Sequence, residues 1–499
     1  MRPPAGSFAF GPTNLRLYPG ARRAIGLDAE GDALRKWLLM LVAAGGFAAL
    51  APWAERGVLT CFGIDDAPGA DEQSASRQPR TAPSVVLVIL DTVRADHLSA
   101  CGYARLTSRF TQVLFSNAEF ATCHAYSPGS WTLPSHASFF TGVPVEQHGA
   151  DSASHGDASL PWGTQFTPLS GRFATLAEKF RERGYRTVLV SGNPVLNEAS
   201  GLTRGFDHVK VGKTFHEMFG EPVVDGVRAQ LGAVPPDEAL FLVVNIADAH
   251  SPWLAVPDDL GWIPPRPVLA HEIDEDSTWA RYVRGDLTPE QLSEARAHYA
   301  DVYDYGVFRA DRTLTGVFAA LRDHHLLAND YRIVVTSDHG ELLLEHDSFG
   351  HGGHLWEGSV RVPFLFLSNR PMPGEPREPF GAMEAHRLLL GEAPLEGPVT
   401  AAGNRRHRLS KIFGVAYPQF RERAVAVWTN ERNKFLMRGN RIERYDTEAD
   451  PDEATPFPVE DERLVQRLEG IAKQAATNDM TAEVSEELQE QLRALGYAH

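Results

Sequence analysis

Polar side chains that can bind a metal ion or move a proton follow four apolar segments of the chain. The segments and the residues after them are Ser84–Leu90 with Asp91, Arg186–Ser191 with Asn193, Ala239–Asn245 with Asp248 and His250, and Tyr331–Thr336 with Asp338 and His339. Their apolarity is continuous rather than alternating, which is typical of strands buried on both faces of a parallel sheet. Because the carboxyl ends of such strands meet at one edge, we expect these side chains to converge on one site.

A second chemical signal is the segment 130–142, in which Thr132, Pro134 and His136 alternate with other residues. Pro134 suits the first turn of a helix, and Gly142 can end it. Thr132 is therefore expected at or near the N-cap, where backbone N–H groups can stabilise an alkoxide or a bound phosphate. His136 follows one turn later on the same helix face. Taken alone, Thr132 is more often an ordinary capping residue.

The adjacent carboxylate and imidazole of Asp338 and His339 suit a divalent metal with mixed oxygen and nitrogen ligands. His346, His351 and His354 follow in or near a Gly-rich segment, and His clusters of this kind indicate metal or anion binding. A surface loop is the alternative for these histidines. The ligand types permit calcium, manganese, magnesium or zinc.

The segments between these residues predict the fold that positions them. We expect a helix from Phe173 to Arg183 and a long one from Thr288 to Arg322, the latter opened by Thr288 as N-cap and Gln291 three residues later. Strands that alternate with helices predict an α/β domain with a mostly parallel central sheet and helices on both faces.

After about residue 420 the pattern changes. Val425–Trp428 and Lys434–Met437 look like strands of another sheet, and residues 486–496 carry leucines at helical spacing. We therefore expect a smaller C-terminal sheet-and-helix subdomain. The loops 251–287 and 370–420 show little periodicity and are expected to hold substrate specificity.

The N-terminal region predicts a membrane anchor. From Trp37 to Ala54, 18 residues carry no charge, and basic residues precede them, which predicts an N-terminus inside and a catalytic domain on the outer, periplasmic or extracytoplasmic side. A buried core helix and a cleaved signal peptide are the alternatives. The expected organisation is a cytoplasmic tail (1–36), a single membrane anchor (37–54), a linker (55–83), a catalytic domain (84–420) and a C-terminal subdomain (421–499).

The net charge and the cysteine count limit which partners and which metal sites the chain can have. The net charge of −17 disfavours nucleic acid as a partner, because an acidic surface repels phosphates. The three cysteines contain no CxxC pair, which excludes a cysteine zinc site, and permit at most one internal disulfide.

The order of these motifs resembles the sulfatase family of the alkaline-phosphatase superfamily over roughly residues 84–499. The motifs are Leu90–Leu98, Thr132-Leu133-Pro134-Ser135-His136 with the closing Thr141-Gly142, Asp248–Trp253, Asp338–Gly340, Trp356–Pro363, Tyr445–Pro451 and Leu492–Tyr497. The resemblance implies an α/β sulfatase-like fold and a divalent metal ion. It implies Asp91, Thr132, Asp338 and His339 as metal ligands, Thr132 as nucleophile, and His250 or His351 as proton donor to the leaving group.

Four positions depart from the sulfatase pattern. Thr132 stands where sulfatases carry the Cys or Ser that becomes formylglycine, and no formylglycine is expected because the extra methyl of threonine would give a ketone. His136 stands at the position of the signature Arg, Thr92 at that of a second Asp, and Gly352, beside His351, at that of a Lys. A Thr nucleophile is similar to that of the superfamily's phosphodiesterases and phosphoethanolamine or phosphoglycerol transferases.

The leading hypothesis is a metal-dependent hydrolase that cleaves phosphate or sulfate esters of small molecules, glycans or lipids through a covalent Thr132 intermediate. Binding of a second ion by Asp248, His250 and His351 would create a two-metal site. One alternative is a phosphoethanolamine or phosphoglycerol transferase acting on envelope glycans or lipids, although such enzymes usually have several membrane segments. Another is an inactive membrane-anchored binding module, which the missing Arg and Lys would favour.

Overall fold

The computed structural model of the chain describes residues 82–152, 166–235, 237–257, 260–264, 278–407, 420–430 and 432–474. The predicted cytoplasmic tail, the predicted membrane anchor, almost all of the predicted linker and the leucine-rich segment 486–496 lie outside these ranges. Within them, no helix combines the length and the apolar composition that crossing a membrane requires.

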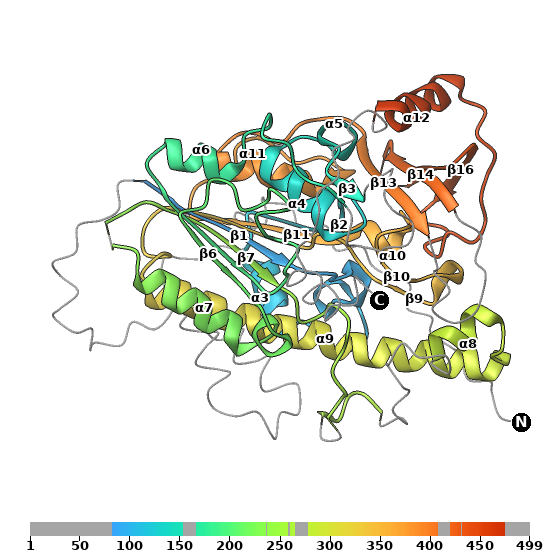
Figure 1. The fold of residues 1–499 in the computed structure, drawn as a ribbon, viewed down its shortest axis with the longest axis horizontal. Helices are drawn as coiled ribbons and strands as arrows, with labels where there is room; N and C mark the ends of the chain where they lie inside the picture. Colours follow the sequence, from blue (N-terminus) through green and yellow to red (C-terminus); the bar gives the residue numbers. More distant parts are fainter. Residues whose placement is uncertain are drawn as a thin grey trace, which may run out of the picture. The chain divides into compact units, whose positions relative to one another are not determined.

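An eight-stranded sheet forms the centre of the described chain (Figure 1). In spatial order its strands are β12 (Phe380–Gly381), β2 (Phe120–Tyr126), β11 (Arg361–Ser368), β8 (Tyr331–Thr336), β1 (Ser84–Leu90), β7 (Leu240–Ile246), β5 (Arg186–Ser191) and β6 (His208–Val211). From β8 to β6 all neighbours are parallel, whereas β11 runs antiparallel to β8 and β2. Every residue of β1 and β7 is buried, as their continuous apolar sequences predict. The expectation of a mostly parallel sheet is confirmed.

Helices cover both faces of this sheet (Figure 1). One face carries α3 (Arg109–Asn117), α7 (Glu221–Gly232) and α9 (Pro289–Asp323), and the other carries α4 (Thr132–Thr141), α6 (Leu176–Glu182) and α11 (Ala385–Leu390). The remaining short elements are α5 (Val145–His148), α8 (Thr278–Arg284), α10 (Glu357–Val360), β3 (Asp151–Ser152), β4 (Phe166–Thr167), β9 (Leu342–Leu343) and β10 (Phe349–Gly350).

Capping chemistry sets the starts of two of the predicted helices. Thr288 and Gln291 form the expected capping box at the start of α9. Thr175 forms a second capping box with Glu178, so α6 begins at Leu176 rather than at the expected Phe173. In both boxes the side chains pair with backbone N–H groups that the first helical turn leaves unsatisfied.

A second, antiparallel sheet consists of β13 (Val399–His407), β14 (Phe420–Trp428), β15 (Asn433–Arg438) and β16 (Arg441–Asp446). Helix α12 (Glu462–Gln474) contacts β14. The subdomain boundary expected between residues 420 and 421 falls inside this sheet, because β13 precedes it. The sequence of β13, with a glycine and two arginines, lacks the apolar run that identified the other strands.

A buried ionic cluster joins the small sheet to α10. Lys434 is fully buried, and its Nζ lies 2.7 Å from Glu453 and 3.2 Å from Glu357. Trp428 donates from its indole nitrogen to Glu357 and stacks on Tyr126 of the central sheet, with ring centroids 4.1 Å apart. The cluster therefore connects β15 to the helix that precedes β11.

A disulfide between Cys101 and Cys123, with Cα atoms 5.8 Å apart, links the segment after β1 to strand β2. This is the single internal disulfide that three cysteines allow. The third cysteine, Cys61, lies outside the described residues.

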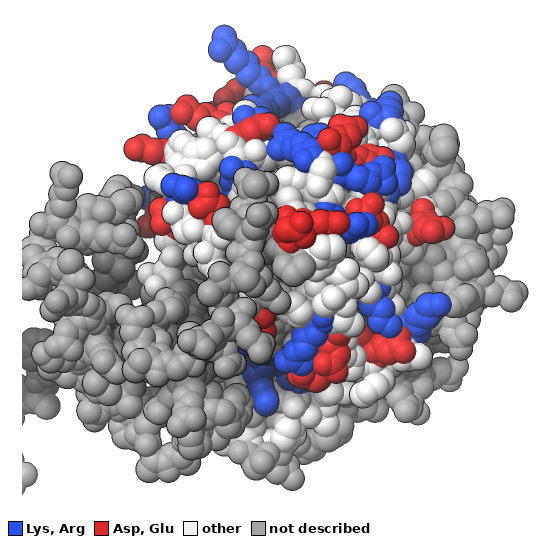
Figure 2. Space-filling model, turned by 90° about the vertical axis from the view of Figure 1, so that its left-hand side faces the viewer, with Lys and Arg blue, Asp and Glu red and all other residues white. Residues whose placement is uncertain are grey.

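Figure 2 views the molecule from the side at which the parallel strands begin. Acidic and basic side chains are interleaved on the described part of this face. Ion pairs there include Arg186 with Glu238 at 2.9 Å and Arg370 with Asp330 at 3.0 Å. A mixed surface of this kind does not select polyanions.

Candidate metal-dependent active site

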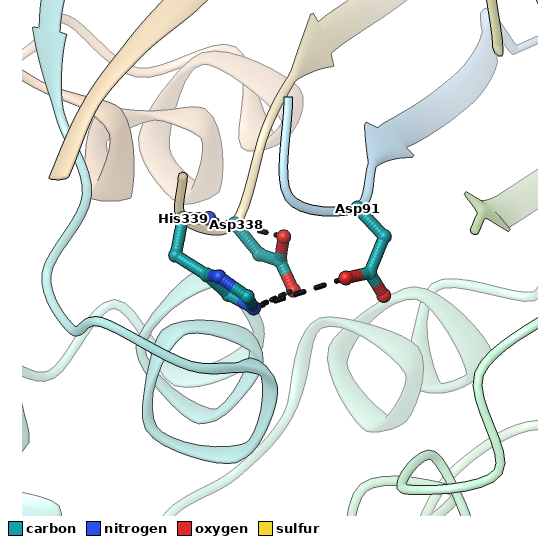
Figure 3. Close-up of side chains that lie close together, drawn as sticks. All are labelled: Asp91, Asp338 and His339. Carbon is teal, nitrogen blue, oxygen red and sulfur yellow. Dashed lines mark hydrogen bonds and ion pairs between the residues drawn. The ribbon is translucent and has the colours of Figure 1, made fainter. Parts of the chain in front are cut away.

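The carboxyl ends of two adjacent strands bring three potential metal ligands together. Asp91 follows β1, and Asp338 and His339 follow its neighbour β8. One side-chain donor atom from each residue lies within 4.8 Å of the others (Figure 3). Among the described residues this is the one group of three or more His, Cys, Asp or Glu side chains with such spacing.

The two carboxylates each leave one oxygen without a hydrogen-bond partner. Asp91 Oδ2 accepts two side-chain hydrogen bonds, whereas Oδ1 has none. Asp338 Oδ1 accepts from the backbone nitrogens of Thr92 and His339, whereas Oδ2 has no partner. Because buried polar atoms are nearly always satisfied, two orphaned carboxylate oxygens beside an imidazole fit a cation.

Electrostatics support this interpretation. Burial, and then the neighbouring Asp91 carboxylate, raise the pKa of Asp338 well above its ordinary value. Two carboxylates that approach each other away from water repel one another unless a positive charge lies between them. A divalent cation would favour the ionised form of both.

His339 has the tautomer that a metal ligand requires. Its Nδ1 donates to the carbonyl of Gly340 at 2.9 Å, so the lone pair is on Nε2. Nε2 lies 3.4 Å from Asp338 Oδ2 and 3.8 Å from Asp91 Oδ1 (Figure 3). Burial, followed by the nearby His351, lowers the pKa of His339 well below its ordinary value, so the ring is neutral as metal binding demands.

Thr132 faces the same point. It is the first residue of α4; Trp131 is the N-cap, and no side chain caps this helix. Thr132 is therefore not an ordinary capping residue. Its Oγ1 lies 3.5 Å from His339 Nε2 and accepts a hydrogen bond from Asn193 Nδ2 at 3.1 Å.

His136 is buried next to Thr132 and Asp338. Its ring is fully buried; Nδ1 donates to the Thr132 carbonyl at 2.9 Å and lies 3.6 Å from Asp338 Oδ2. Burial lowers its pKa to about 4, so the ring is neutral. His136 thus cannot replace the charge of the arginine expected at this position, and its contacts suit support of Thr132.

His351 lies between His250 and His339 in a row of close ring contacts. The ring centroid of His351 lies 4.8 Å from that of His250 and 4.5 Å from that of His339. Nδ1 of His351 donates to the buried carboxylate of Glu341, at 3.0 Å from each oxygen. Burial alone would lower the pKa of His351, but the Glu341 carboxylate raises it overall. Burial, and then His351, lower the pKa of His250.

The hypothesis of a second ion bound by Asp248, His250 and His351 is wrong in one ligand. The carboxylate of Asp248 accepts from the Gly220 backbone and from Thr313, and lies 3.0 Å from Arg309 on α9. These partners hold the Asp248 carboxylate, and Arg309 and Thr313 lie 61 and 65 residues later in the chain, so sequence spacing could not reveal them.

Two other histidines of the Gly-rich region also have structural contacts. His346 stacks on Trp356 with ring centroids 3.9 Å apart, and His354 Nε2 lies 3.0 Å from Ser348 Oγ. Two residues near the site had not been assigned a role from the sequence: Asn245 and Glu341. The detectable signals were an amide inside an apolar strand and a carboxylate two residues after His339.

This arrangement defines a class: an α/β protein whose sheet edge holds a buried Asp–Asp–His cluster and a helix-terminal hydroxyl. The chain belongs to the sulfatase family, whose family model matches residues 83–382.

Relatives and solved structures agree with this assignment. Arylsulfatase K of Xenopus laevis is 33% identical over 105 residues, which cover 21% of this chain and 18% of the frog protein. A protein solved in complex with its substrate D-glucosamine-2-N,6-O-disulfate has a TM-score of 0.60 at 16% identity and covers 80% of this chain and 99% of its own. The phosphonate monoester hydrolase of Agrobacterium radiobacter has a TM-score of 0.54 at 17% identity and covers 81% and 97%. The solved structures share the fold.

Proposed function

We propose that the chain is a metal-dependent hydrolase that cleaves sulfate or phosphate esters with Thr132 as nucleophile. The observation that carries the proposal is the position of Thr132 Oγ1, at the start of α4 and 3.5 Å from the lone-pair nitrogen of His339. A hydroxyl beside a candidate metal cluster and a helix N-terminus suits attack on an anionic ester.

Each residue of the site has a proposed role in this reaction. Asp91, Asp338 and His339 would hold a divalent cation, with Thr132 as a further contact. Such a cation, when bound, lowers the pKa of a neighbouring hydroxyl and neutralises charge on the ester. Thr132 would attack, and His351, whose Nδ1 is fixed by Glu341, would present Nε2 to the leaving oxygen. His250 packs against His351 and would share this role.

The similar proteins act on anionic esters of different kinds. One binds a sulfated glucosamine, and another is a phosphonate monoester hydrolase. We therefore propose a small-molecule or glycan ester as substrate. The absence of a formylglycine precursor at position 132 supports phosphate esters at least as well as sulfate esters.

The test is the hydrolysis of bis-nitrophenyl phosphate and nitrophenyl sulfate by wild type and Thr132→Ala, together with metal analysis. We expect the wild type to contain or require a divalent metal, and the variant to lose activity by about a thousandfold or more on the preferred ester. Full activity of Thr132→Ala would refute the nucleophile assignment. The pair of substrates identifies the class of ester.

We further propose that residues 37–54 anchor the protein in a membrane, with the catalytic domain outside the cytoplasm. The uncharged segment and the basic residues before it support this proposal. The Cys101–Cys123 disulfide is an independent support, since disulfides persist mainly in oxidising compartments. Fractionation of cells, followed by protease treatment of the intact cells or spheroplasts, tests it: a cytoplasmic, protease-protected domain would contradict it.

A further inference from the structure

Two asparagines on neighbouring strands bind the same oxygen of Asp91. Asn245 lies in β7, in register with Ile89 of β1, and Asn193 follows β5, the next strand along. Both side chains are fully buried. Asn193 Nδ2 donates to Asp91 Oδ2 at 2.8 Å, and Asn245 Nδ2 donates to it at 3.0 Å.

These hydrogen bonds decide which oxygen of Asp91 can bind a cation. With two N–H groups directed at Oδ2, only Oδ1 faces the candidate metal cluster, where it lies 3.8 Å from His339 Nε2. Asp91 can therefore act as a one-oxygen ligand in a fixed orientation. Hydrogen bonds to an ionised carboxylate are strong, and outer residues of this kind orient metal ligands.

Asn193 has a second contact that Asn245 lacks. Its Nδ2 also donates to Thr132 Oγ1 at 3.1 Å, so the two hydrogens of one NH₂ group reach a metal ligand and the nucleophile. Its Oδ1 accepts from the backbone nitrogen of Val195 at 2.9 Å, which fixes the orientation of the amide. An N–H donor at Oγ1 would stabilise negative charge on that oxygen and hold it toward His339.

Asn245 differs in its remaining contacts. Its Nδ2 lies 3.5 Å from His136 Nε2, and its Oδ1 has no hydrogen-bond partner. A buried amide oxygen without a partner costs stability, so packing does not explain an asparagine near the carboxyl end of this apolar strand. The hydrogen bond from Asn245 Nδ2 to Asp91 Oδ2 does explain an asparagine at this position.

We propose that Asn193 and Asn245 are positioning residues with separable roles. Asn245 fixes Asp91 and has its other amide contact to His136, whereas Asn193 donates to both Asp91 and Thr132 Oγ1 and so couples the metal ligand to the nucleophile. The inference rests on the proposed function of the same site, but it assigns roles to two residues outside the ligand set.

The matched variants Asn193→Leu and Asn245→Leu test this proposal, since each replaces an amide with an apolar group of similar size. The first measurement is Zn²⁺ affinity by competition with a chelating dye, which requires no turnover. We expect both variants to bind Zn²⁺ about tenfold or more weakly than wild type. Wild-type affinity in both would overturn the role assigned toward Asp91.

The second measurement is kcat on bis-nitrophenyl phosphate at saturating Zn²⁺. We expect kcat of Asn193→Leu to be about tenfold or more below that of Asn245→Leu, because only Asn193→Leu loses the donor to Thr132 Oγ1. Equal kcat in both variants would overturn the role of Asn193 toward Thr132. Asn193→Ser and Asn245→Ser, compared in the same way, replace either leucine variant that fails to fold.

Failure of the proposed function gives a different result. Full activity of Thr132→Ala would refute the nucleophile, while the Zn²⁺ affinities would still decide whether the asparagines fix Asp91.

Discussion

Asp338 Oδ2 lies 3.4 Å from His339 Nε2. Both atoms belong to the buried cluster that includes Asp91, and no hydrogen-bond donor reaches Asp338 Oδ2 among the described residues. Two neighbouring residues of one chain thus present an acceptor oxygen and a lone-pair nitrogen to the same point. A metal-free protein would hold this arrangement at a cost, because like charges and lone pairs repel where no cation separates them.

Asp338→Asn should therefore make the free energy of unfolding much less dependent on added metal. Without metal, burial and Asp91 raise the pKa of Asp338 in the folded protein above its unfolded value. The stability it contributes is present below the unfolded pKa and is lost as pH rises through the folded pKa. We expect the metal-free variant to be at least as stable as metal-free wild type at pH 7 and to lack this decline.

The measurement is thermal unfolding with chelator and with added Zn²⁺. Wild type should gain about 2.7 kcal/mol when free Zn²⁺ is a hundredfold above its Kd, and the variant should gain much less. An equal gain in both proteins would show that Asp338 does not bind the ion. Asp330→Asn, a half-buried substitution away from the site whose side chain pairs with Arg370, is the matched control.

Several of these contacts could be predicted from the sequence because their signals are local. The continuous apolar runs of β1, β7, β5 and β8 placed Asp91, Asn193 and Asp338 at one sheet edge. The proline at position 134 and Gly142 placed Thr132 at a helix start.

Other contacts depend on partners far away in the chain. Asp248 follows a strand like Asp91 does, but Arg309 on α9 turns it away from the site. Within the loop 370–420, which showed no periodicity, α11 packs on β1 and β8, and β13 pairs with β14. Neither pairing leaves a mark in the local sequence, because both depend on which surface the rest of the fold offers.

Glu341→Gln should lower turnover and leave metal binding unchanged. Glu341 accepts from His351 Nδ1 and thereby directs the other ring nitrogen away from itself. Without the carboxylate charge, we expect kcat on the preferred ester to fall by about ten- to a hundredfold. The Zn²⁺ affinity should stay at the wild-type value.

The control for this variant is Glu345→Gln, in which a glutamate four residues away loses its ion pair with Arg94. Steady-state kinetics with both variants separate the effect of His351 orientation from a general effect of changing this loop. Equal losses of kcat would mean that the loop, rather than the orientation of His351, limits the reaction.

His148 should make the folded protein sensitive to acid. The backbone N–H of Ala150 donates to its Nδ1 at 3.0 Å, and its Nε2 donates to Ser138 Oγ at 2.9 Å, so the neutral ring satisfies both contacts. Burial lowers its pKa to about 3 in the folded state. Because the folded pKa lies below the unfolded one, its contribution is present above the unfolded pKa and is lost as pH falls toward 3.

Urea unfolding at pH 7 and pH 5 measures this effect. Between these values wild type should lose about 2 kcal/mol through His148. His148→Gln should be less stable at pH 7 but should show a smaller loss at pH 5, whereas the exposed His124→Gln should behave like wild type. An unchanged pH dependence in His148→Gln would contradict the assignment.

Lys434→Met should leave two buried carboxylates without their cation. Lys434 is fully buried between Glu357 and Glu453, and burial already raises the pKa of Glu453 to about 7. Removal of one partner from such a cluster costs about 3–5 kcal/mol, because the remaining charges stay desolvated. The small sheet should loosen first, since Lys434 connects β15 to α10.

The dependence on pH distinguishes charge from packing in this variant. A buried glutamate with a raised folded pKa contributes stability at low pH and loses it as pH rises through that pKa. The deficit of Lys434→Met in urea unfolding should therefore be largest above pH 7 and shrink toward pH 5, as Glu453 takes up a proton. In Lys434→Met combined with Glu453→Gln, the deficit should be smaller at pH 7 because one unpaired charge is gone. A deficit that is the same at pH 5 and pH 8 in the single variant would mean that Lys434 contributes through burial of its aliphatic chain and not through its charge.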